Sequence, residues 1–97
     1  MKITTSVRVG PAIYTVDFFD PTDYPSGKDG IWGSCNHTEM SILVDSRACH
    51  TRQFQTMIHE VVEAMNDQYD LRLKHHQVIL LETAWTSFIR DNPEVFQ

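Results

Sequence analysis

The chain has 97 residues, of which 41% are apolar and 22% are charged, and its formal net charge is −5. This length and composition predict one globular domain over residues 1–97, with a single modest hydrophobic core. The eight Lys and Arg residues form no basic stripe, and no apolar run is long enough to span a membrane. We therefore expect neither nucleic acid nor a membrane as a partner.

The first half of the sequence combines β-branched and aromatic residues with turn signals, which predicts strands. The predicted strands cover residues 7–9, 12–19, 31–36 and 40–44. A Gly10-Pro11 pair predicts the turn between the first two, and the prolines and glycines of residues 20–30 predict a loop before the third. The last two strands are expected to form a hairpin, with its turn at residues 36–39.

The second half predicts two helices, over residues 51–69 and 75–90, because apolar residues recur there at helical spacing. The expected core stripes comprise Phe54, Met57, Ile58, Val61, Met65 and Tyr69 in the first helix, and Val78, Leu81, Trp85 and Phe88 in the second. Tyr14 and Trp32 are also expected in the core. The predicted fold is α+β, with a small antiparallel sheet of about three strands followed by two antiparallel helices.

One pattern in the first helix suggests metal chemistry. His59 and Glu63 are four residues apart, so their side chains are neighbours on one helix face and could hold one divalent ion. Glu60, next to His59, occupies the position of the general base in zinc hydrolases. The competing interpretation is a solvated polar face, because Arg52 and Asp70 fall on the same side of the helix.

A third metal ligand is expected from the start of the second helix. The short connection between the helices brings the beginning of the second near the end of the first. His75 and His76 are both candidates. His75 is preferred because it projects nearer the buried side, and His76 is the close alternative. Two solvated histidines at a helix N-terminus are the competing interpretation.

The segment FQTMIHEVVEAMN, residues 54–66, resembles the active-site helix of small zincin-like metallopeptidases of phages and prophages, related in pattern to SprT-like and ImmA-like minimal zincins. Shorter similarities at residues 10–16, 31–33, 42–45 and 90–93 extend the resemblance over nearly the whole chain. The usual zincin string has His where Glu63 stands, and the usual downstream ligand near His75 and His76 is often a carboxylate. The two ligand types are thus exchanged, and the set remains two imidazoles and one carboxylate.

The resemblance implies a zinc-dependent metallopeptidase in which a metal-activated water attacks a peptide bond, with Glu60 as the general base. It implies metal ligands at His59, Glu63 and either His75 or His76. The partner would be a peptide or protein, which the strand over residues 40–44 could bind along its edge. The alternative is a non-catalytic protein-binding module of phage type that keeps the zincin-like fold and a structural metal.

The two cysteines bear on two further predictions, the cellular compartment and a second zinc site. Cys35 and Cys49 are too few for a disulfide framework, and the N-terminal residues lack the apolar stretch of a secretory signal. We therefore expect a cytoplasmic protein, located in the host cytoplasm if it is encoded by a phage. Cys35 with His37 and Cys49 with His50 could together supply four ligands to a structural zinc, but their spacing matches no standard zinc knuckle. Separate, partly buried cysteines are the simpler interpretation.

Overall fold

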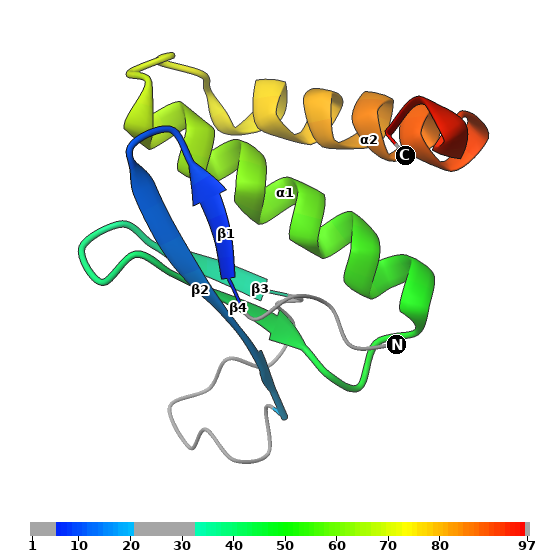
Figure 1. Cartoon of the computed structure of the whole chain (residues 1–97), viewed down its shortest axis with the longest axis horizontal. Coiled ribbons are helices and arrows are strands. Elements are labelled where there is room, and N and C mark those ends of the chain that lie inside the picture. Colours follow the sequence, from blue (N-terminus) through cyan, green and yellow to red (C-terminus); the bar gives the residue numbers. More distant parts are fainter. Residues whose placement is uncertain (1–5, 21–32, 97) are drawn as a thin grey trace.

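The chain forms three layers, in which a β-sheet, one helix and a second helix are stacked in that order (Figure 1). The structure is a computed structural model that describes residues 6–20 and 33–96. Its elements are the strands β1 (Ser6–Val9), β2 (Ala12–Phe19), β3 (Gly33–Asn36) and β4 (Ser41–Asp45), the helices α1 (His50–Gln68) and α2 (His75–Asp91), and a short 3-10 helix, η2 (Pro93–Phe96). The predicted α+β fold, a small sheet followed by two helices, is confirmed. The predicted loop from residue 21 onward, the start of the third strand and Trp32 lie outside the described residues.

The sheet has four strands in the order β1-β2-β4-β3. β1 pairs with β2, and β3 with β4, in antiparallel hairpins, whereas β2 and β4 are parallel. The sheet thus has four strands where about three were predicted, and it is mixed rather than purely antiparallel. Side-chain alternation marks which residues are in strands, but it does not reveal how two hairpins are placed beside each other.

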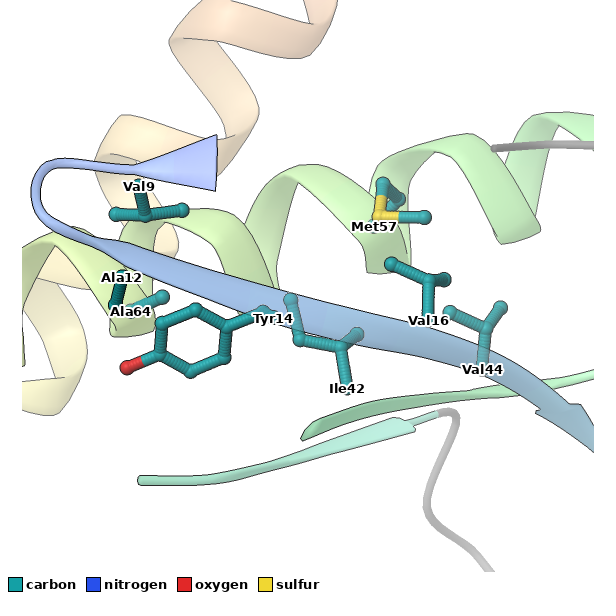
Figure 2. Packing of buried hydrophobic residues seen from close by; sticks show 8 residues of the cluster. All are labelled: Val9, Ala12, Tyr14, Val16, Ile42, Val44, Met57 and Ala64. Carbon is teal, nitrogen blue, oxygen red and sulfur yellow. The ribbon is translucent and has the colours of Figure 1, made fainter. Parts of the chain in front are cut away.

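One face of the sheet packs against α1 and forms the core. The alternation of β2 turns Ala12, Tyr14 and Val16 toward the helix and leaves the residues between them exposed. Figure 2 shows these side chains meeting others from β1, β4 and α1. The buried cluster comprises Val9, Ala12, Tyr14, Val16, Ile42, Val44, Met57 and Ala64.

The core face of α1 is rotated relative to the predicted stripe. Met57 is buried as expected, but Met65 and Tyr69 are 41% and 57% exposed. The helix is covered by the sheet on one side and by α2 on another (Figure 1). Its buried residues therefore include two polar ones, Thr56 and Glu60.

The helix α2 packs mainly against α1 and runs in the opposite direction (Figure 1). Its buried residues are Val78, Glu82 and Thr86, which recur every four residues and face α1. The predicted stripe of α2 was wrong beyond Val78, because Trp85 is 46% exposed and Leu81 and Phe88 are similarly exposed. With one neighbouring layer, α2 buries only a narrow strip.

The connection between the helices is held by Asn66. Its side-chain amide donates to the backbone oxygen of Leu73 at 3.1 Å, and its side-chain oxygen accepts from the Leu73 backbone N–H at 2.8 Å. The Gln77 side chain then accepts a hydrogen bond from the Lys74 backbone N–H at 2.8 Å. These bonds fix where α2 begins, and therefore where His75 lies.

The strand β3 approaches α1 closely at Gly33. A Cβ atom at this position would lie 2.5 Å from Cγ2 of Thr56 and 2.6 Å from the backbone oxygen of Leu43. Both distances are far below van der Waals contact, so only glycine fits without movement. This close approach brings the sheet edge beside the middle of α1.

We predict that Gly33→Ala lowers the free energy of unfolding by about 1–3 kcal/mol, because the added methyl overpacks the contact with α1. The matched control is Ser34→Ala, since Ser34 points to the open face of the sheet. The control should change stability by less than about 0.5 kcal/mol. Urea unfolding of both variants measures the difference, and equal midpoints for the two variants would contradict the expected crowding.

Candidate metal centre

Three side chains of metal-ligating type converge where α2 begins beside α1. His59 and Glu63 are one turn apart on α1, and His75 is the first residue of α2. One ligand atom from each lies within 4.8 Å of the others. Within the described part of the chain, no other group of His, Cys, Asp or Glu side chains meets this condition. The group could therefore hold a metal ion.

The two histidines differ in exposure and come from different elements. The His59 ring is half-buried, and the His75 ring meets it edge-on, with 5.9 Å between the ring centroids. His76, the alternative third ligand, is exposed and is not part of the group. The structure thus brings His75, rather than its neighbour, to the two residues of α1.

A groove of about 520 Å³ leads to this group between the two helices and the start of β3. His59 and His75 line it together with Glu60. The remaining lining residues are Gly33, Arg52, Gln55, Thr56, Ile79, Glu82 and Thr83. A ligand in the groove would therefore lie against His59, His75 and Glu60 at once.

Glu60 is a buried carboxylic acid at the wall of this groove. Only 5% of the residue is exposed, and within the described part of the chain its carboxylate makes no hydrogen bond. Burial is the main cause that raises the pKa of Glu60 to about 7, an increase that His59 opposes and that the carboxylates of Glu63 and Glu82 reinforce. A carboxyl group with this pKa exchanges a proton near neutral pH.

Sequence reasoning missed Glu82, a buried acid on α2. Its Oε1 atom lies 2.7 Å from Nδ1 of His59, and its Oε2 atom accepts a hydrogen bond from the side-chain amide of Gln55. The available signal was its position seven residues after His75, which places both on one face of the helix. That signal was obscured because the more apolar side of α2 was taken as its inner face.

The second proposed zinc cluster is not formed. Cys35 and His37 are neighbours, with 3.6 Å between Sγ and Nδ1, and His37 lies near Asp67 at the end of α1. Cys49 and His50 are at the other end of this 19-residue helix, roughly 25 Å away along its axis. Burial, together with nearby carboxylates, raises the pKa of Cys35 to about 12, so its thiol stays protonated. Both cysteines are free.

Comparison of the chain with family models, curated proteins and solved structures finds no match. The resemblance to small zincins is therefore a hypothesis, and the case for a function rests on the geometry of this site. No helix in the described residues has both the length and the apolar character needed to cross a membrane.

We predict that Glu60→Gln stabilises the metal-free protein in a pH-dependent way. Because the pKa is about 7 in the folded state against an ordinary 4.5, the folded protein binds more protons than the unfolded chain between these values. The wild type therefore loses stability as pH rises through this range, whereas Gln has no proton to lose. The advantage of the variant should reach the order of 3 kcal/mol and stay constant at higher pH.

Chemical unfolding in the presence of a chelator, at several pH values from about 4 to 8, measures this difference. A difference between variant and wild type that does not change with pH would contradict the assigned cause, which is the buried, ionised carboxylate.

Proposed function

We propose that this protein is a zinc-dependent hydrolase of the minimal zincin type that cleaves peptide bonds. The observation that carries the proposal is the convergence of His59, Glu63 and His75 beside a groove that Glu60 lines together with the two histidines. Three protein ligands and an open position are typical of catalytic zinc sites, whereas structural sites usually have four protein ligands.

The donor set fits zinc. Two imidazoles and one carboxylate form a known set of catalytic zinc ligands. With metal–ligand bonds of about 2.1 Å, the donor atoms of a tetrahedral site are roughly 3.4 Å apart. The present separations of up to 4.8 Å need only small side-chain rotations to reach this. Exposed His75, at the start of α2, has the freedom to make such a rotation.

Bound zinc would lower the pKa of a water molecule and polarise a carbonyl group. Glu60 follows His59 directly, lines the groove and has no competing hydrogen bond among the described residues. Its carboxylate is therefore available to accept a proton from the attacking water and return it to the leaving amine.

The sheet order revises the prediction of which strand could pair with a peptide substrate. β4 pairs with both β2 and β3, so the predicted binding along residues 40–44 was wrong. In the described part of the sheet, β3 is the edge strand beside the site, and Gly33 at its start lines the groove. An extended peptide that paired with β3 would pass the groove next to Glu60.

One observation favours the alternative, a non-catalytic binding module with a structural metal. Leu81, Trp85 and Phe88 form an exposed apolar strip on α2, and such strips often mark protein contacts. Under this alternative the metal ligands stay the same and Glu60 has no chemical role. The two functions therefore differ in what a change at Glu60 does.

The test uses protein purified without an affinity tag. Elemental analysis should find close to one equivalent of zinc in the wild type and in Glu60→Gln, and His59→Ala should lose it. Hydrolysis of fluorescently labelled casein and of a quenched peptide library should fall at least about 100-fold in Glu60→Gln. Glu94→Gln, which alters an exposed carboxylate in η2, is the control and should retain both zinc and activity.

Two results would contradict the proposed hydrolase function. Less than about a tenth of an equivalent of zinc after supplementation would remove the metal that the chemistry requires. Full zinc binding with no difference in hydrolysis between wild type and Glu60→Gln would instead support the binding module.

A further inference from the structure

Glu82 is a buried carboxylate whose two oxygens are both used by side chains of α1. Oε1 lies 2.7 Å from Nδ1 of His59, and Oε2 accepts from the Gln55 amide. The side chain of Glu82 is only 11% exposed and that of His59 only 21%. An acid is unusual on the inner strip of a helix, where Val78 lies one turn earlier, because a charge is costly to bury unless it is paired.

This contact determines which nitrogen of His59 is free. A carboxylate accepts hydrogen bonds, so the proton of the neutral imidazole is held on Nδ1, facing Glu82. The lone pair is then on Nε2, on the other side of the ring. A metal ion binds a neutral imidazole through the nitrogen that carries no proton, so Nε2 is the atom that His59 offers.

The second oxygen of Glu82 makes this orientation rigid. Because Gln55 holds Oε2 while His59 holds Oε1, the carboxylate cannot rotate without losing one of the two bonds. Gln55 and His59 are one turn apart on α1, so both partners are fixed to the same rigid element. The imidazole ring is thus held from behind before any ion arrives.

We propose that Glu82 is a positioning residue for the metal centre, which sets the tautomer and the ring orientation of His59. The proposal rests on the metal site of the proposed function but does not require that the protein hydrolyses anything. It also gives α2 two roles, since the helix supplies the ligand His75 and, two turns later, the carboxylate that aligns a ligand of α1. Metal binding and the docking of α2 on α1 are then coupled.

The first test is zinc affinity, measured by competition with a chromophoric chelator for the wild type, Glu82→Gln and Glu82→Ala. Loss of a carboxylate that orients a metal-binding histidine typically weakens binding 10- to 100-fold, and we expect a loss of about this size in both variants. In Glu82→Gln one of the two acceptor oxygens becomes an NH₂ donor, so His59 and Gln55 can no longer each donate to a separate oxygen. Thr86→Val is the matched control, because Thr86 is buried on the same strip one turn later and its hydroxyl has no partner in the described structure.

The second test reads the tautomer directly and needs no metal. Long-range ¹H–¹⁵N correlation spectra of the metal-free wild type, at about pH 8 where imidazole is neutral, should show the His59 proton on Nδ1. In Glu82→Ala the ring should shift toward the form protonated on Nε2, which free imidazole side chains prefer in water. If Glu82→Ala does not fold, the wild-type spectrum and the affinity of Glu82→Gln still decide.

The possible failures are distinguishable. Zinc affinities of both Glu82 variants within about twofold of the wild type, or a wild-type His59 protonated on Nε2, would overturn the positioning role. If the Glu82 variants weaken zinc binding as expected but the wild type has no peptidase activity, the proposed hydrolase function would be contradicted and the positioning role retained. A wild type that binds no zinc would overturn both.

Discussion

The contact between α2 and α1 is the constraint on which the candidate site depends. His75 reaches His59 and Glu63 only because α2 returns along α1 after a connection held by Asn66. Val78 is the one apolar residue that α2 fully buries, and such a side chain contributes roughly 1.5–3 kcal/mol. The rest of the buried strip is polar, so the hydrogen bonds that Glu82 accepts from His59 and Gln55 make this contact specific. An ion shared by both helices would add to their packing energy, because a ligand that binds only the folded form stabilises it.

On its other side, α1 packs against the sheet, and this contact also shapes the groove of the candidate site. Gly33 lets β3 approach Thr56 so closely that the edge of the sheet becomes a wall of the groove. Glu60 is buried at this contact and lacks a hydrogen-bond partner among the described residues. Such an arrangement lowers stability at neutral pH, and departures of this kind from good packing are most often found at functional sites. The same contact therefore explains both the need for glycine and the raised pKa of Glu60.

The sequence was sufficient to predict the elements and much of the site. The absence of Gly and Pro and the helical spacing of apolar residues gave both helices to within one residue at each end. The spacing of His59 and Glu63, with the short connection that follows, also predicted that His75 or His76 would lie near them, and the preferred His75 is the one that does. These features are local, or follow from the geometry of a helical hairpin, so periodicity and loop length are enough to determine them.

What the sequence did not reveal depends on how the layers are stacked. The parallel pairing of β2 with β4 joins two hairpins, and no local pattern encodes it. The inner face of α2 was misassigned because Leu81 and Trp85 are more apolar than Glu82 and Thr86, although the latter pair faces α1. Glu82 can be buried because His59 and Gln55 form hydrogen bonds with its carboxylate. This complementarity is visible only once the two helices are placed side by side.

The central claim is that one metal ion is held between the two helices. Anomalous diffraction at the zinc absorption edge, on crystals of protein loaded with zinc, tests it most directly. The account predicts a single strong peak bounded by Nε2 of His59, a carboxylate oxygen of Glu63 and the His75 ring. A zinc-loaded crystal with no peak between these side chains, or with its peak at another part of the chain, would contradict it.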